Sequence, residues 1–155
     1  MRVPLVATPS SKSEAQPDSD HGSPPPRARV LVVDDDADIR ETVASLVALA
    51  GNGRRPYVST AGSGEEAIAL MAELSFSLLV TDYHLGGADG LAVLSRARAA
   101  SPGVPCIFMT ADPEAARILE ESGLAVNTVL MEKPFGVDPF VAVVMRALGV
   151  SVAAT

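Results

Sequence analysis

Six polar residues each stand at or just beyond the end of a short apolar run of the sequence: Asp34, Asp35, Asp36, Asp82, Thr110 and Lys133. If those runs are parallel strands of one sheet, their carboxyl ends meet at a single edge, and the polar side chains converge there. Two carboxylates about 5 Å apart repel by about 3 kcal/mol at an effective dielectric constant of about 20. The cluster therefore needs a compensating charge, which a hard divalent cation supplies.

Magnesium suits such a cluster because it prefers oxygen ligands, keeps several waters and takes only one or two carboxylates plus phosphate oxygens. Asp35 and Asp82 are the expected direct ligands. A carboxylate can attack a phosphoryl group to form an acyl phosphate, a reaction that mainly needs in-line positioning and neutralised charge on the equatorial oxygens. Mg²⁺, Lys133 and Thr110 together can provide both. These residue types predict phosphoryl chemistry at an aspartate.

The elements that must position these residues follow from hydrophobic periodicity. Short β-branched runs predict five strands at 29–33, 57–61, 77–81, 106–109 and 128–131. After each run, apolar residues recur at helical spacing, with stripes that include Val43, Ala67, Leu94, Leu119 and Val144. This alternation is typical of a parallel sheet covered by helices on both faces.

Several helix boundaries carry recognisable signals. Ser63 with Glu66 forms the pattern of a capping box. Asp112 and Asp138 each precede a proline, which predicts an N-cap followed by proline at the first helical position. Gly51 and Gly123 are expected to end the first and fourth helices.

We therefore predict an α/β fold, a flavodoxin-like doubly wound five-stranded parallel sheet in the order 2-1-3-4-5 with five helices. Residues 29–149 form the domain. Residues 1–28 hold six of the twelve prolines and show no periodicity, so we expect a disordered leader, and 150–155 form a C-terminal tail.

Composition restricts the function classes. Hydrophobic residues make up 48% of the chain and no stretch approaches the ~20 apolar residues of a membrane span, so we expect a soluble, cytoplasmic protein without a membrane partner. Basic and acidic residues balance before residue 29, so the net charge of −7 belongs to the rest of the chain. An acidic domain disfavours nucleic acid as a partner. The single cysteine, Cys106, is expected to be a buried core residue.

Four segments, VLVVDDD, LLVTDYHLGGADG, FMTAD and EKPF, resemble in order the signature segments of response-regulator receiver domains of two-component systems. The resemblance covers roughly residues 29–148. It implies phosphorylation on Asp82 by a sensor histidine kinase or a phosphotransfer protein. It also implies Asp34 as the acid that reaches the metal through water, Asp35 as a direct ligand, and His84 as donor of a backbone carbonyl to the metal.

By the same resemblance, Thr110 is the switch hydroxyl that bonds a phosphoryl oxygen, and Lys133 pairs with the phosphoryl group. Ala111 is the small neighbour that leaves room for the phosphate. The side chains of His84 and Asp112 take positions that flank the attacking water and tune dephosphorylation.

The sequence departs from the family pattern at two places. Leu130 stands three residues before Lys133, where receivers usually have an aromatic switch residue. Gly86 and Gly87 follow Asp82 where a proline is common, which predicts a looser loop and an altered phosphoryl lifetime.

Each of these residues also has a purely structural interpretation. The acids of 34–38 can cap a helix, where its dipole favours negative charge. Asp82 can be a turn residue and Thr110 an ordinary strand end, and a lysine such as Lys133 is more often solvated than functional. The occurrence of all four segments in order favours the functional interpretation.

No output domain is evident, so we expect signalling by binding a downstream protein through the fourth helix, fifth strand and fifth helix, or a relay to a phosphotransfer histidine. The chain is expected to catalyse only its own phosphorylation and dephosphorylation. Two alternatives remain. One is an aspartyl-nucleophile phosphatase with Asp34 as nucleophile, although Asp138 is the only acid after Lys133. The other is an interaction module that works without phosphorylation.

Overall fold

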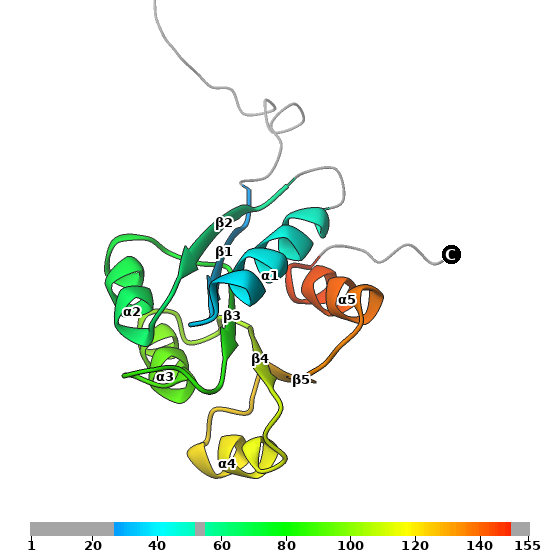
Figure 1. Cartoon of the computed structure of the whole chain (residues 1–155). Helices are drawn as coiled ribbons and strands as arrows, with labels where there is room; N and C mark the ends of the chain where they lie inside the picture. Colours follow the sequence, from blue (N-terminus) through cyan, green and yellow to red (C-terminus); the bar gives the residue numbers. More distant parts are fainter. Residues whose placement is uncertain (1–26, 52–54, 150–155) are drawn as a thin grey trace, which may run out of the picture.

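A computed structural model describes residues 27–51 and 55–149 of the chain (Figure 1). The strands are β1 (Arg29–Val33), β2 (Tyr57–Ala61), β3 (Leu78–Asp82), β4 (Cys106–Thr110) and β5 (Thr128–Glu132). The helices are α1 (Ala37–Leu49), α2 (Gly64–Glu73), α3 (Gly90–Ala100), α4 (Ala115–Ser122) and α5 (Val137–Ala147). Except for residues 27 and 28, the predicted leader lies outside the described residues, as does the predicted tail.

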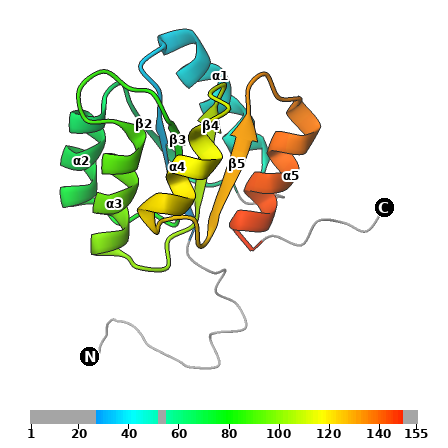
Figure 2. The same ribbon diagram turned by 90° about the horizontal axis from the view of Figure 1, so that it is seen from below.

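All neighbouring strands are parallel, and the sheet has the order β2-β1-β3-β4-β5. Helices α1 and α5 cover one face of the sheet and α2, α3 and α4 the other, as the two perpendicular views show (Figures 1 and 2). The predicted fold class and strand order are confirmed. The first two strands also have the predicted bounds.

The sheet separates two apolar clusters. Leu31 and Val33 of β1 face the helices α2 to α4, whereas Val30 and Val32 face α1 and α5, because side chains alternate along a strand. Cys106 is buried in the first cluster, as predicted.

Strand pairing continues one residue further than the apolar runs at β3, β4 and β5. The backbone N–H of Tyr83 donates to the Met109 carbonyl at 2.9 Å, and that of Lys133 donates to the Thr110 carbonyl at 2.7 Å. Asp82 is therefore the last residue of β3 rather than the first of a loop, and the predicted end at Thr81 was one residue short.

The predicted caps at Asp112 and Asp138 were wrong. Asp112 accepts a bond from the Glu114 backbone N–H at 2.9 Å, but this closes a turn, and α4 begins only at Ala115. Gly136 is the N-cap of α5, so Asp138 lies inside the first turn, where the helix dipole favours an acid. An aspartate before a proline is compatible with either a cap or a turn, which is why the sequence misled.

Two other helix ends agree with the sequence. Gly123 ends α4 in a left-handed conformation, with φ 80°. The Ser63 hydroxyl caps α2 by accepting from the Glu66 N–H, although the Glu66 carboxylate reaches back to the N–H of Gly62 at 2.8 Å rather than to that of Ser63. None of the helices described is long and apolar enough to cross a membrane.

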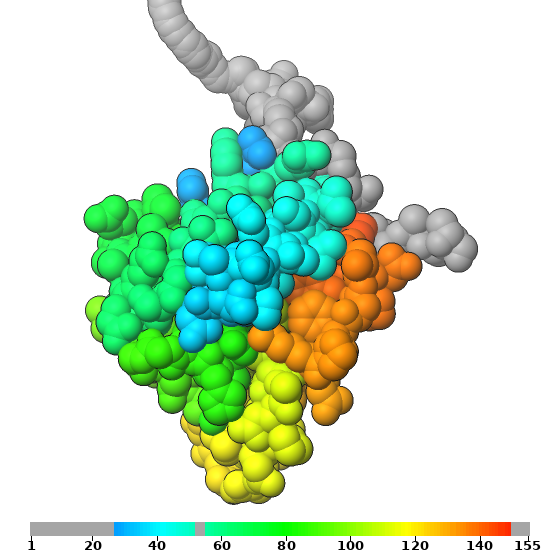
Figure 3. Space-filling model, viewed as in Figure 1, coloured from blue at the N-terminus to red at the C-terminus, as the bar shows by residue number. Residues whose placement is uncertain are grey.

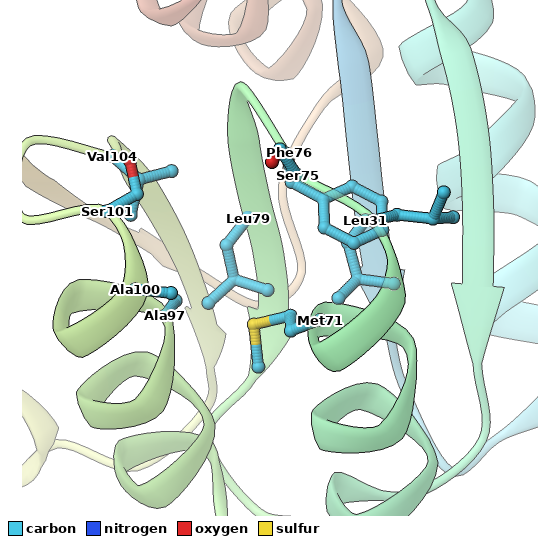
Figure 4. A pocket seen from close by; sticks show the side chains of 10 residues that line it. Leu31, Met71, Ser75, Phe76, Leu79, Ala97, Ala100, Ser101 and Val104 are labelled. Atoms are coloured by element: carbon cyan, nitrogen blue, oxygen red, sulfur yellow. The ribbon is translucent and has the colours of Figure 1, made fainter.

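A cavity of about 160 Å³ lies between α2, α3 and the sheet (Figure 4). Its lining includes Met71 of α2, Ala97 of α3 and Leu79 of β3, together with residues that precede β3 and β4. It lies toward the amino ends of these strands, away from the polar residues that end them.

Candidate functional site

Three of the predicted acids meet at the carboxyl edge of the sheet. One carboxylate oxygen each of Asp34, Asp35 and Asp82 lies within 4.8 Å of the other two. The ammonium of Lys133 stands 3.4 Å from Asp82 Oδ1 and 3.6 Å from Asp34 Oδ2. The convergence expected from parallel topology is therefore present, with the Lys133 ammonium beside two of the three carboxylates.

Asp34 is the most constrained member of the cluster. Its side chain is 1% exposed, and its Oδ1 accepts from the Asp36 N–H at 2.9 Å. Its buried Oδ2 has no hydrogen-bond partner among the described residues, since Lys133 Nζ at 3.6 Å forms an ion pair but is too distant for a hydrogen bond. Arg40, which the sequence gave no reason to select, donates to the Asp34 backbone carbonyl at 2.7 Å.

The helix-cap interpretation of the first acidic segment holds for Asp36. Its carboxylate accepts from the N–H groups of Asp38 and Ile39 and so caps α1. Asp34 and Asp35 stand before that cap and belong to the cluster. One segment thus provides both a helix cap and two site residues.

The electrostatics of the cluster favour a bound cation. Burial raises the pKa of Asp82; the Lys133 ammonium opposes this shift, and the charge of Asp34 adds to it. Among the described residues, only the Lys133 ammonium forms an ion pair with these carboxylates, and it cannot balance three of them; Asp34 Oδ2 is buried there without a hydrogen bond. These oxygen donors are the ligands that Mg²⁺ prefers, so the residues fit a divalent cation.

The backbone of Asp82 packs closely against the first residue of α3. Gly90 begins α3 against the strand end, and a Cβ at that position would come within 2.4 Å of the Asp82 carbonyl oxygen. The Gly90 N–H also donates to the Tyr83 carbonyl at 3.0 Å. The Asp82 side chain nevertheless remains 13% exposed, whereas that of Asp34 is almost wholly buried.

Thr110 lies beside Lys133 at the ends of β4 and β5. It is buried, and its backbone carbonyl accepts from the Lys133 N–H. Its hydroxyl oxygen accepts from the Asp112 N–H at 2.9 Å, so its own proton is free to be donated elsewhere. Ala111 and Lys133 also border an open cavity between α1 and the loop before α5.

The side chains of His84 and Asp112 meet, as their flanking positions implied. His84 Nε2 is 3.2 Å from Asp112 Oδ2 and joins the loop after β3 to the loop after β4. A hydrogen bond from the Glu114 backbone N–H, with a second bond to His84, lowers the pKa of Asp112. The role of the His84 backbone carbonyl as a metal ligand stays a prediction.

The loop that contains the glycine pair after Asp82 is bound to α2 by a residue that the sequence did not indicate. Glu65 Oε2 accepts from the Ala88 N–H at 2.9 Å. Gly87 adopts φ 79°.

Leu130 of β5 stands at the place of the usual aromatic residue. It is partly buried against the apolar cluster that contains Phe108.

Comparison with known proteins agrees with this geometry. Residues 30–145 match the response regulator receiver domain family. The DNA-binding transcriptional regulator NtrC of Salmonella typhimurium is 37% identical over 124 residues, which cover 79% of this chain and 25% of that protein. This chain therefore spans about a quarter of the length of that relative.

Solved structures show the same domain. The receiver domain of NtrX from Brucella abortus is 30% identical with a TM-score of 0.65, and the match covers 79% of this chain and 99% of that one. The receiver domain of the Francisella response regulator 1452 is 25% identical with a TM-score of 0.66, over 79% and 98% of the two chains. Together with the acidic edge and its lysine, these matches show that the chain belongs to the response regulator receiver domain family of two-component systems.

Proposed function

We propose that this chain accepts a phosphoryl group on Asp82 from a sensor histidine kinase or a phosphotransfer protein, in a reaction that depends on Mg²⁺. The observation that carries the proposal is the arrangement at the sheet edge: Asp82 keeps an exposed fraction, lies 3.4 Å from Lys133, and shares a cluster with two further acids. The family assignment supports the same chemistry.

The metal would be held by Asp35 and Asp82 directly, by Asp34 through water, and by the His84 backbone carbonyl. When bound, Mg²⁺ supplies positive charge that offsets the cluster and the oxygens of the transferring phosphoryl group. Asp34 is suited to an outer role because its Oδ1 already accepts a backbone bond and its position is fixed. Arg40 fixes the same turn through the Asp34 carbonyl.

Asp82, Lys133 and Thr110 have different roles in the proposed phosphoryl transfer. The phosphorus–nitrogen bond of the donor phosphohistidine breaks as an Asp82 oxygen bonds to phosphorus, and the donor histidine leaves as a neutral imidazole that keeps the proton on its other ring nitrogen. Lys133 lies close enough to Asp82 to pair with a phosphoryl oxygen, and the Thr110 hydroxyl proton is free to bond another. Hydrolysis of the acyl phosphate returns Asp82, and the side chains of His84 and Asp112 border the path of the attacking water.

The phosphatase alternative with Asp34 as nucleophile is disfavoured. A nucleophile that turns over external substrate must be reached by it, but the Asp34 side chain is 1% exposed and one of its oxygens is engaged by the Asp36 N–H. The phosphorylation-independent interaction module remains a separate hypothesis, which the experiment below also tests.

We propose that phosphorylation of Asp82 is transmitted to other proteins through protein–protein contacts. Helix α4, in yellow, projects from the body of the molecule (Figure 3). Thr110 ends β4, which the following loop connects to α4, and the Thr110 carbonyl accepts from the Lys133 N–H just after β5. A change in Thr110 on phosphorylation would therefore reach α4, β5 and α5 directly. Either a downstream target protein or a phosphotransfer protein with an acceptor histidine would bind the surface formed by α4, β5 and α5.

Incubation with acetyl phosphate and Mg²⁺, followed by intact mass spectrometry, tests the proposal. The parent chain is expected to gain one phosphoryl group and Asp82→Ala none. Asp138→Ala, which removes an exposed acid on α5, is the matched control and should behave as the parent. Phosphorylation of Asp82→Ala to the parental level would overturn the assignment, and a parent that gains nothing would favour the interaction module.

A further inference from the structure

The loop between β3 and α3, residues 83–89, begins at the proposed phosphoacceptor and contains the glycine pair. Its two ends are fixed: the Gly90 N–H bonds the Tyr83 carbonyl at 3.0 Å, and the Asp89 carboxylate caps α3 by accepting from the Ala92 N–H at 2.9 Å. Between these ends stand Gly86 and Gly87, whose backbones have the widest conformational freedom of any residue. By itself this sequence predicts a mobile loop.

Helix α2 contacts the middle of that loop closely. Glu65 Oε2 accepts from the Ala88 N–H at 2.9 Å. A Cβ on Gly87 would come within 2.6 Å of both Glu65 oxygens, and one on Gly64 within 2.1 Å of the Ala88 carbonyl. The Gly64 backbone therefore packs directly on the Ala88 backbone, and the Glu65 carboxylate packs on Gly87.

We propose that Glu65 is a positioning residue for the phosphoacceptor site: its bond to the Ala88 N–H holds the β3–α3 loop in place of the proline that receivers commonly carry there. This inference rests on the proposed function. Among the described residues, the Glu65 side chain bonds the Ala88 N–H and neither Asp82 nor its acidic neighbours, so it would act through the loop that carries His84.

The physical reason is the cost of ordering the loop. Fixing the backbone of a residue in one conformation costs conformational entropy, and this cost is largest for glycine. A metal or phosphoryl group that needs the loop in one conformation must supply that free energy unless the protein has already done so. Glu65 supplies part of it before any ligand arrives.

Glu65→Ala is the primary test, with Glu65→Gln and Glu73→Ala beside it. Glutamine keeps an oxygen that can accept from the Ala88 N–H and removes the charge. Glu73→Ala makes the same substitution at an exposed position at the far end of α2. Amide hydrogen exchange at Ala88, the Mg²⁺ dissociation constant and the rate of phosphorylation by acetyl phosphate are measured for each, with urea unfolding to report global stability.

In Glu65→Ala, we expect Ala88 amide exchange to accelerate and Mg²⁺ binding to weaken, each by about fivefold, the factor that corresponds to one hydrogen bond of ordinary net strength. Phosphorylation should slow in parallel. Glu65→Gln should recover most of all three quantities, whereas Glu73→Ala should match the parent. Recovery by glutamine would show that the hydrogen bond matters rather than the charge.

Two outcomes would overturn the inference. If Glu65→Ala speeds Ala88 exchange but leaves Mg²⁺ affinity and phosphorylation at parental values, the contact is structural only. If exchange itself does not change, the contact does not hold the loop. A parent chain that neither binds Mg²⁺ nor gains phosphate would instead overturn the proposed function and the positioning role with it, so the two failures are distinguishable.

Discussion

Replacement of Asp34 by asparagine should make the metal-free domain more stable and at the same time remove most of its response to magnesium. Asparagine has nearly the same shape and keeps the Oδ1 that accepts from the Asp36 N–H. It replaces the buried Oδ2, which has no hydrogen-bond partner among the described residues, with an uncharged amide group. The substitution therefore removes a charge without creating a cavity.

The expected magnitude follows from the distances. At a dielectric constant of about 20, Asp82 repels Asp34 by at least about 3.5 kcal/mol when their oxygens lie within 4.8 Å. Lys133 attracts Asp34 by about 4.6 kcal/mol at 3.6 Å. Repulsion from Asp35, which is exposed and well screened, brings the two contributions close to balance. What remains is the burial of an oxygen that accepts no hydrogen bond, which costs roughly 1–3 kcal/mol.

We therefore expect Asp34→Asn to raise the free energy of unfolding by about 1–2 kcal/mol in EDTA. Mg²⁺ at ten times its dissociation constant should stabilise the parent by about 1.4 kcal/mol, and the variant far less, because binding to the folded state alone shifts the equilibrium by mass action. Urea unfolding with and without Mg²⁺ measures both values. Glu41→Gln, which neutralises an exposed acid on α1, is the control and should show the parental response.

An Asp34→Asn variant less stable than the parent in EDTA would show that the charge of Asp34 stabilises the metal-free domain, contrary to this expectation. Equal stabilisation of both proteins by Mg²⁺ would show that Asp34 contributes nothing to the metal site.

Two further predictions concern the turn residues. Gly123→Ala should lower the free energy of unfolding, measured with urea, by about 1 kcal/mol because position 123 has φ 80°. Gly103→Ala, with open space around it, should change the same free energy by less than about 0.5 kcal/mol. Equal losses in the two variants would contradict this. In a carbon-13 NMR titration, the pKa of Asp112 should lie below the ordinary value of about 3.9 and rise in His84→Ala while staying low because of the Glu114 N–H bond. An unchanged midpoint would show that His84 has no influence.

Most of the site could be predicted because strand ends are well marked in the sequence. A buried parallel strand needs an uninterrupted apolar run, so the first polar residue after each run falls at the sheet edge. Topology then brings Asp34, Asp82 and Lys133 together although they are far apart in the chain. The pairing order decides which residues meet, and five alternating units leave few orders to choose from.

The remainder could not be predicted because it depends on contacts between loops and helices. Glu65 is one of nineteen acidic residues, and nothing in its spacing separates it from the helix surface around it. Arg40 reaches the Asp34 carbonyl across a turn whose geometry the sequence does not specify. The two aspartate–proline pairs misled because one cap pattern serves both a helix start and a preceding turn.

The separation of the apolar clusters by the sheet has a consequence for how such a chain can vary. No buried side chain is common to the two clusters, and residues without shared partners contribute independently to stability. Related chains can therefore exchange the packing on the α1 and α5 side while keeping that on the α2, α3 and α4 side, or the reverse. Exchange on either side would leave in place the backbone hydrogen bonds of the sheet and the acidic cluster at its carboxyl edge.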